Sequence, residues 1–233
     1  MISYVIPALN EERSIGKVIA GIKEIDKDGE IIVVDSDSTD RTSEISRASG
    51  AVVVNEPRRG YGYAYRKGFS VARGEIIVTL DGDGTYPPDE IKRLLDTLSE
   101  GYDFVSGGRL SGSSREAISS MHMVGNKILS LLARILFMVN VVDSQSGMWA
   151  FRTNILNKIM PSADGMEFSE EIKIRAATEF CYKEVPISYG RRMGEKKLRP
   201  WKDGINNLLF LLKLRATSGL RTKHFRCSQS GER

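Results

Sequence analysis

The chain has 233 residues, of which 41% are hydrophobic, enough for one large α/β domain with a buried core. A formal charge of +4 and a pI near 9.0 suit phosphorylated ligands or an anionic membrane surface; without a nucleic-acid-binding motif, we expect no nucleic-acid partner. Cys181 and Cys227 follow no metal or redox spacing, so ordinary thiols in a reducing compartment are expected.

The first half of the sequence alternates apolar runs with helical segments. The runs predict strands at residues 2–8, 30–34, 52–54 and 76–80. Between them, helices are predicted from Asn10 to residue 25, from the polar hinge 35–40 to residue 48, and from the turn 58–62 to residue 72. Strands and helices alternate at βαβ spacing, which predicts a doubly wound, mostly parallel sheet in a Rossmann-like α/β domain.

The second half is less regular. Strands are predicted at residues 103–107, 146–151 and 185–189, and helices at 118–138, 167–179 and 205–214. Loops rich in serine and glycine (106–114) and in basic residues (190–202) separate them. We expect one domain over residues 1–216 and a polar tail over 217–233.

The most informative stretch is residues 74–88. Its buried run ends abruptly at Asp81-Gly82-Asp83, and Pro87 and Pro88 then predict the start of a helix. Ligands of open α/β sheets bind outside the carboxyl ends of the strands, so the two carboxylates lie where a ligand would be held. These two hard oxygen ligands lie beside Gly82 and Gly84, which let a phosphate approach the backbone, so they suit a divalent cation that also coordinates a nucleotide diphosphate.

Asp81-Gly82-Asp83 has two other possible structural explanations. A solvated turn explains an isolated Asp-x-Asp equally well, and the motif alone does not decide between the two. A calcium-binding EF-hand is excluded, because Tyr86 stands at the sixth position and Lys92 at the twelfth, where glycine and glutamate are required.

Six motifs together resemble glycosyltransferase family 2, and within it the polyprenyl-phosphate (dolichyl-phosphate) mannosyl- and glucosyltransferases. The motifs are Pro7-Ala8-Leu9-Asn10-Glu11, the segment 33–40, Leu80-Asp81-Gly82-Asp83 with Pro87-Pro88, the segment 143–148, the segment 184–187, and Arg191 with Gly194 and Lys197. The resemblance covers residues 2–215. It implies a GT-A fold, a nucleotide-sugar donor (GDP- or UDP-linked), Mg²⁺ or Mn²⁺, and transfer of mannose or glucose with inversion.

The resemblance also implies roles for individual residues. The nucleoside pocket would be lined by Pro7, Leu9, Glu11, Val34 and Asp35. Asp81, Gly82 and Asp83 would face the diphosphate and the metal, with Asp83 as the favoured direct ligand. Two departures from the family pattern stand out: Ser36-Asp37 replaces Asp-Gly, and Thr85 replaces a glutamine beside the metal.

The acceptor implied by the resemblance, a polyprenyl phosphate, is already an anionic nucleophile at neutral pH, because its second pKa is near 6. A dedicated general base is unnecessary, and the site needs cations that hold two anions together. Arg109, Arg191 and Lys197 are predicted for this role, with Arg109 and Asp83 as the catalytic pair; Arg58 and Arg59 are second choices.

Several side chains keep two interpretations. Gln145 and Trp149 could border the acceptor or sugar pocket, or belong to the core. Glu170 and Glu171 begin a helix, where the helix dipole already explains them, although the family often places an acid near the sugar.

The apolar helical segments 128–142 and 205–214 have basic flanks. Such segments suit a membrane interface, but core packing or an oligomer interface explains either one equally well. No stretch reaches the ~20 apolar residues of a spanning helix, and the N-terminus lacks the basic region of a signal peptide. A cytoplasmic protein, peripheral to the membrane, is therefore expected. A small soluble acceptor, or nucleotide-sugar binding without turnover, are the alternative functions.

Overall fold

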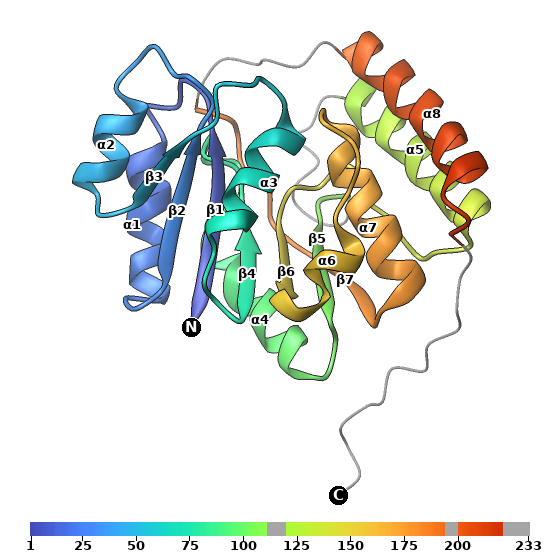
Figure 1. Ribbon diagram of the computed structural model, residues 1–233, viewed down its shortest axis with the longest axis horizontal. Coiled ribbons are helices and arrows are strands. Elements are labelled where there is room, and N and C mark those ends of the chain that lie inside the picture. Colours follow the sequence, from blue (N-terminus) through green and yellow to red (C-terminus); the bar gives the residue numbers. More distant parts are fainter. Residues whose placement is uncertain (111–119, 194–199, 221–233) are drawn as a thin grey trace, which may run out of the picture.

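The computed structural model describes residues 1–110, 120–193 and 200–220, which are built around one seven-stranded sheet (Figure 1). The strand order is β3-β2-β1-β4-β6-β5-β7. The strands are β1 (Ile2–Ala8), β2 (Glu30–Asp35), β3 (Val52–Asn55), β4 (Ile76–Thr79), β5 (Phe104–Gly108), β6 (Trp149–Arg152) and β7 (Tyr182–Pro186). The expected α/β class is confirmed.

The sheet is parallel except at β6. This strand runs antiparallel to both of its neighbours, β4 and β5, so that Trp149 at its start lies opposite Thr79 at the end of β4. The segment that leads into β6 therefore arrives at the edge of the sheet where the parallel strands end. The sheet is therefore mostly parallel, as predicted from the sequence.

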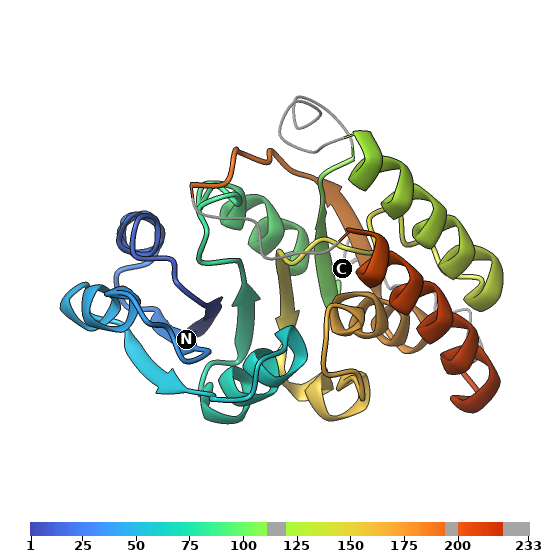
Figure 2. The same cartoon turned by 90° about the horizontal axis from the view of Figure 1, so that it is seen from above.

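Helices cover both faces of the sheet. The helices are α1 (Ile15–Ile25), α2 (Thr42–Ala48), α3 (Tyr61–Val71), α4 (Glu90–Ser99), α5 (Ser120–Phe137), α6 (Leu156–Ile159), α7 (Glu167–Glu179) and α8 (Pro200–Thr217). α1 and α4 pack on one face and α3 and α7 on the other, whereas α5 and α8 lie side by side beyond α7 (Figures 1 and 2). No helix in the described ranges combines the length and apolar character that crossing a bilayer requires.

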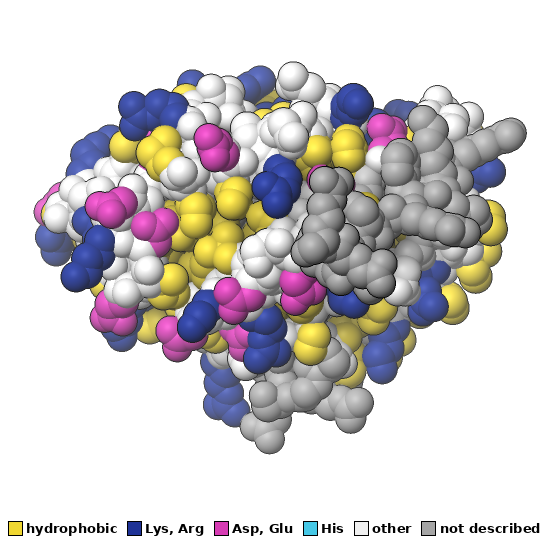
Figure 3. Space-filling view, turned by 90° about the horizontal axis from the view of Figure 1, so that it is seen from below, with side chains coloured by type: hydrophobic (Ala, Val, Ile, Leu, Met, Phe, Trp, Pro, Cys, Tyr) yellow, Lys and Arg dark blue, Asp and Glu magenta, His cyan; other side chains and the backbone are white. Residues whose placement is uncertain are grey.

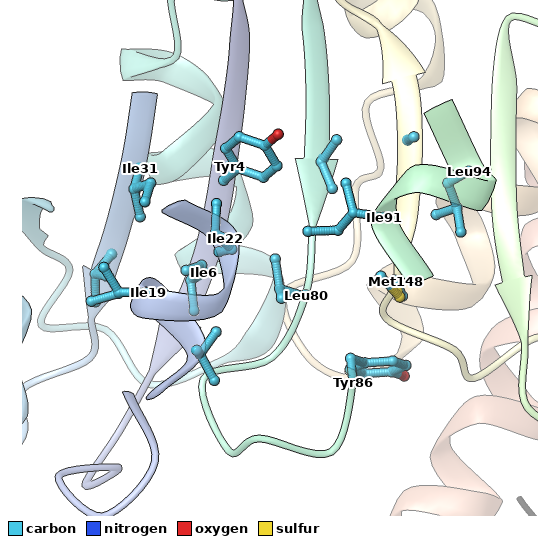
Figure 4. Close-up of a cluster of buried hydrophobic side chains, with 14 of the residues drawn as sticks. Tyr4, Ile6, Ile19, Ile22, Ile31, Leu80, Tyr86, Ile91, Leu94 and Met148 are labelled. Carbon is cyan, nitrogen blue, oxygen red and sulfur yellow. The ribbon is translucent and has the colours of Figure 1, made fainter. Parts of the chain in front are cut away.

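Two cores of different composition fill the layers. On the α1 and α4 face, aliphatic side chains such as Ile6, Ile19, Leu80 and Leu94 pack together (Figure 4). The α3 and α7 face is aromatic. It contains Tyr65, Phe69, Phe104, Trp149, Phe151 and Phe168. In the view from the end where the parallel strands begin, acidic and basic side chains are mixed among apolar ones, with no large region of a single charge (Figure 3).

Several predicted boundaries are wrong, among them the start of β6, at Trp149 instead of residue 146, and the start of α8, at Pro200 instead of residue 205. Asn10 does not begin α1: it has a φ of 50°, and its side chain instead accepts a hydrogen bond from the Thr39 amide at 2.8 Å, so the helix begins at Ile15. β7 begins at Tyr182, three residues before the predicted strand, because an edge strand carries polar residues that hide its pattern. The short turns over residues 153–159 were not predicted.

Candidate active site

The turn after β4 places both predicted acids at the carboxyl edge of the sheet. Asp83 is 5% exposed, and its Oδ1 accepts hydrogen bonds from the amide (3.0 Å) and hydroxyl (2.6 Å) of Thr85. The Ser14 hydroxyl donates to the Gly82 carbonyl at 2.8 Å, which ties the turn to the loop after β1. The turn is therefore fixed before any ligand arrives, which is the preorganisation that electrostatic catalysis requires.

Asp81 is half-buried and contacts α3. The Tyr61 hydroxyl donates to its Oδ1 at 2.9 Å, and the Tyr65 hydroxyl lies 3.2 Å from that of Tyr61. Burial, and next the negative charge of Asp83, raise the pKa of Asp81 to about 7, while Tyr61 and two arginines oppose the rise. A carboxylate whose pKa is raised by a second carboxylate beside it lies in a site that favours a cation.

Arg192 connects the two sides of this site. Its guanidinium pairs with Glu11 Oε1 at 2.5 Å and with Asp83 Oδ2 at 3.2 Å. The backbone holds the same segment in place: the Met193 amide donates to the Asp83 carbonyl (3.3 Å) and the Gly190 amide to the Thr85 carbonyl (2.7 Å). Segment 190–193 therefore lies across the acidic turn. Arg192 was not predicted; its neighbour Arg191, which was, is exposed.

The predicted nucleoside residues lie at the ends of two adjacent strands. Pro7 is paired with Val34, and Asp35 ends β2. Asp35 is 6% exposed, and its carboxylate accepts hydrogen bonds from the Ser38 amide at 3.0 Å and from the Ser43 hydroxyl. Leu9 is half-buried, whereas the Val34 side chain is fully buried in the aromatic core. The structure thus brings Pro7, Leu9 and Asp35 to one edge and turns the Val34 side chain away from it.

Arg109, just after β5, is held by Asp143. The guanidinium donates to both carboxylate oxygens at 2.8 Å, and the Arg109 amide donates to Oδ2 at 2.8 Å. Asn126 of α5 donates to Oδ1 at 2.6 Å. Burial alone would raise the pKa of Asp143, but Arg109 outweighs it and holds the pKa well below its usual value. Arg109 also acts electrostatically on Asp81 and opposes the rise in the pKa of that carboxyl.

A cavity of about 320 Å³ opens beside Arg109 and Asp143. It is lined by Leu110, Lys127, Ser130, Leu131, Arg134, Val142 and Glu184. Two cations at its wall suit an anion, and the apolar side chains suit a hydrocarbon chain next to that anion.

The other predicted site residues differ in their surroundings. Arg58 pairs with Glu56 at 2.7 Å, and Arg59 is exposed. Trp149 is fully buried in the aromatic core, so its core interpretation holds. Gln145 accepts a hydrogen bond from Asn207 of α8 at 3.1 Å. Lys197 lies outside the described residues.

Glu170 and Glu171, near the start of α7, are fully buried, so a favourable interaction with the helix dipole does not fully explain these two residues. Glu171 accepts hydrogen bonds from the Ser162 and Ala163 amides and forms an ion pair with Arg175. Within the described residues, neither oxygen of Glu170 has a hydrogen-bond partner.

The donor set fits the Mg²⁺ or Mn²⁺ that the resemblance implies. Hard carboxylate oxygens of Asp81 and Asp83 lie at the strand end where a diphosphate would supply further oxygens. In the part of the chain that the structure describes, no group of three His, Cys, Asp or Glu side chains is arranged to hold a metal ion. The two acids would therefore share the cation with the phosphates of a ligand, as is usual for Mg²⁺.

Comparison with known families decides the assignment. The family model described as glycosyl transferase family 2 matches residues 3–160. The chain belongs to glycosyltransferase family 2. The resemblance and the GT-A fold predicted from the sequence are both confirmed.

Two relatives of this family member come from Haloferax volcanii. The low-salt glycan biosynthesis hexosyltransferase Agl6 is 37% identical over 91% of this chain, which spans only 53% of that relative. A dolichyl-phosphate hexose transferase is 37% identical over 87% of this chain and 89% of the relative.

Among solved structures, the glycosyltransferase resembles glucosyl-3-phosphoglycerate synthase from Mycobacterium tuberculosis. The TM-score is 0.72 with 28% identity, over 92% of this chain and 79% of the other. That structure is a complex with Mn²⁺, UDP and glucosyl-3-phosphoglycerate.

Proposed function

We propose that this family member transfers a hexose, mannose or glucose, from a GDP- or UDP-linked donor to a polyprenyl phosphate. One observation carries the proposal furthest: Arg109 acts electrostatically on the acidic turn, and its neighbour Leu110 lines a cavity that has Lys127 and Arg134 at its wall. The turn suits the donor diphosphate, and the cavity suits the phosphate and first isoprene units of the acceptor. The two Haloferax relatives, a dolichyl-phosphate hexose transferase and a hexosyltransferase, support the same reaction class.

In this reaction an acceptor phosphate oxygen attacks the anomeric carbon, and the bond from that carbon to the donor diphosphate breaks. The nucleoside diphosphate leaves and the anomeric configuration inverts. A divalent cation held by Asp81 and Asp83 would neutralise charge on the departing diphosphate. Arg109 orients the acceptor phosphate against its repulsion by the donor. Arg192, now paired with Glu11 and Asp83, is placed to bind the diphosphate.

The predicted nucleoside pocket remains part of this proposal. Glu11 and Asp35 would accept hydrogen bonds from the base or the ribose, with Pro7, Leu9 and the Val34 backbone region forming the wall. Arg191 and Lys197, which are close to Arg192 in the sequence, would add positive charge. The domain of residues 1–216 contains all of these groups.

The outer surfaces of α5 and α8 support a peripheral membrane location. Six exposed apolar side chains follow spacings of three and four: Met121, Val124, Ile128, Leu131, Ile135 and Met138. α8 adds Ile205, Leu209 and Leu212. Lys127 and Arg134 are exposed and flank the stripe, and their positive charge favours an anionic lipid surface over a second copy of the chain. The cavity beside Arg109 would then open at the bilayer.

A transfer assay tests the proposal. The purified protein with Mn²⁺ and radiolabelled GDP-mannose or UDP-glucose should label a polyprenyl phosphate, recovered in the organic phase, and Asp83→Asn should not. If label moves only to phosphoglycerate, the soluble-acceptor alternative, which the likeness to glucosyl-3-phosphoglycerate synthase favours, replaces the lipid acceptor. Donor binding without transfer to any acceptor would leave a nucleotide-sugar-binding protein.

Flotation with anionic vesicles tests the membrane surface. The wild type should float, and Ile128→Glu with Ile135→Glu should remain in the pellet. Val52→Glu is the matched control, because Val52 is similarly exposed, at 49%, but lies on β3 at the other end of the sheet. Equal flotation of all three proteins would contradict the membrane role.

A further inference from the structure

The loop of residues 143–147 joins the two sides of the site. At one end, the Asp143 carboxylate holds the Arg109 guanidinium. At the other end, Gly147 lies against Asp81: a Cβ there would be 3.2 Å from Asp81 Oδ1 and would collide with the Tyr61 hydroxyl. The position of this loop therefore sets the position of Arg109 relative to the acidic turn.

A buried lysine of α7 holds this loop. Lys173 is 0% exposed, and its ammonium group donates to the carbonyls of Asp143 (2.7 Å) and Ser146 (2.8 Å). The Ser146 carbonyl also accepts from the Ser169 hydroxyl at 2.8 Å and from the Trp149 indole at 2.7 Å. Three donors on one carbonyl, two of them from α7, fix the loop backbone to the helix.

Burying the charged ammonium group of Lys173 to bind two carbonyls costs desolvation free energy. Burial lowers the pKa of Lys173 to about 7; the charges of Asp143, Glu184 and Glu170 oppose this, and Arg109 adds to it. A methionine would fill similar space without that penalty. The side chain nevertheless points its ammonium group at the backbone that carries the Arg109 partner. This arrangement is explained if the loop position matters for the reaction.

We propose that Lys173 is a positioning residue for Arg109: by holding the carbonyls of Asp143 and Ser146, it keeps the Asp143 carboxylate where it orients the guanidinium towards the acceptor. The inference rests on the proposed role of Arg109 in holding an anionic acceptor. Lys173 itself touches no reactant.

Steady-state kinetics of Lys173→Met test the inference. Misplacement of a reacting group by about 1 Å costs up to about 10²-fold, so kcat/KM for the acceptor should fall between about 10- and 100-fold. The KM for the nucleotide sugar should change little. Lys158→Met, which removes an exposed lysine of α6, is the matched control and should leave both constants unchanged.

A double-mutant cycle separates positioning from general loss of structure. Asp143→Asn should show the same selective loss, and the double variant with Lys173→Met should lose little more, because both changes act on one contact. Additive losses, or equal losses for donor and acceptor, would overturn the inference. If Lys173→Met does not fold, Ser169→Ala serves instead, because it keeps the lysine charge and removes one donor to the Ser146 carbonyl. This variant should show a smaller selective loss of kcat/KM for the acceptor. An unchanged kcat/KM for the acceptor would refute the inference.

A readout without turnover distinguishes this inference from the proposed function. In ¹⁵N-arginine NMR spectra, the bonded Nε–H of Arg109 (2.8 Å to Asp143) should exchange slowly in the wild type and rapidly in Lys173→Met. Arg109→Lys assigns the resonance. A protected resonance in both proteins contradicts the positioning role, whereas absence of transfer by the wild type contradicts only the proposed reaction.

Discussion

Asp143→Asn is the most informative single substitution for the stability of this protein. Asp143 is fully buried, and the Arg109 side chain is only 12% exposed, so the substitution leaves a guanidinium without its counter-charge in a place that water hardly reaches. Removing one partner of such a pair costs about 3–5 kcal/mol. At about 2–4 °C per kcal/mol for a domain of this size, the melting temperature should fall by roughly 6–20 °C.

The stability difference between the wild type and Asp143→Asn should depend on pH in a defined direction. The pKa of Asp143 is depressed in the folded protein, so the stability it contributes is fully present above its unfolded pKa of about 4 and is lost as the pH falls through the folded value. The difference between wild type and variant should therefore be constant above about pH 5 and shrink below about pH 4.

Thermal unfolding followed by circular dichroism across this pH range is the assay. Glu44→Gln is the control: it breaks the Arg41–Glu44 pair, whose side chains are 68% and 65% exposed, and should leave the melting temperature nearly unchanged. If Asp143→Asn melts no lower than Glu44→Gln, the Arg109 pair is not a buried, stabilising contact and the reasoning fails.

Three further outcomes are expected. Asp83→Asn keeps the turn with Thr85 but removes a charge at the diphosphate, so turnover should fall by at least about 10²-fold with the fold intact by circular dichroism. Tyr61→Phe removes the hydrogen bond to Asp81, so the Mn²⁺ concentration for half-maximal binding in calorimetry should rise about 10-fold, while Tyr63→Phe should not change it. Burial raises the pKa of Glu170 to about 8, so the free energy of unfolding should decline as the pH rises from about 4.5 to 8. Urea titrations should show that Glu170→Gln makes this decline smaller.

The local pattern of apolar and polar residues in the sequence was sufficient to predict much of the sheet. The strand Ile2–Ala8 and the helix Glu167–Glu179 have the predicted bounds, and the acids of the β4 turn lie at the predicted edge. These features depend on neighbouring residues: a β-branched run, an acidic first turn, and polar residues that end a buried strand. Such signals need no knowledge of distant contacts.

Contacts between distant segments were not predictable in this way. Arg109 meets Asp143 across 34 positions, and Arg192 meets Glu11 across 181. Helix α7 shows why: Glu170, Glu171 and Lys173 suggest a solvated face, yet all three are fully buried. No periodicity distinguishes a charged residue that faces water from one that supports a loop inside the protein. The resemblance to the family supplied Arg191, whereas the geometry indicates its neighbour.

The reversed strand β6 limits how the site can change. Trp149 and Phe151 face the aromatic core, while Met148 and Ala150 face the aliphatic one, so inserting or deleting one residue before β6 would exchange these faces and force an indole into space shaped for a methyl group. Segment 143–147 can therefore hardly vary in length, and Asp143 and Gly147 are also fixed by their contacts with Arg109 and Tyr61. Redesign of acceptor choice should keep the length of this segment and place any extra residues elsewhere.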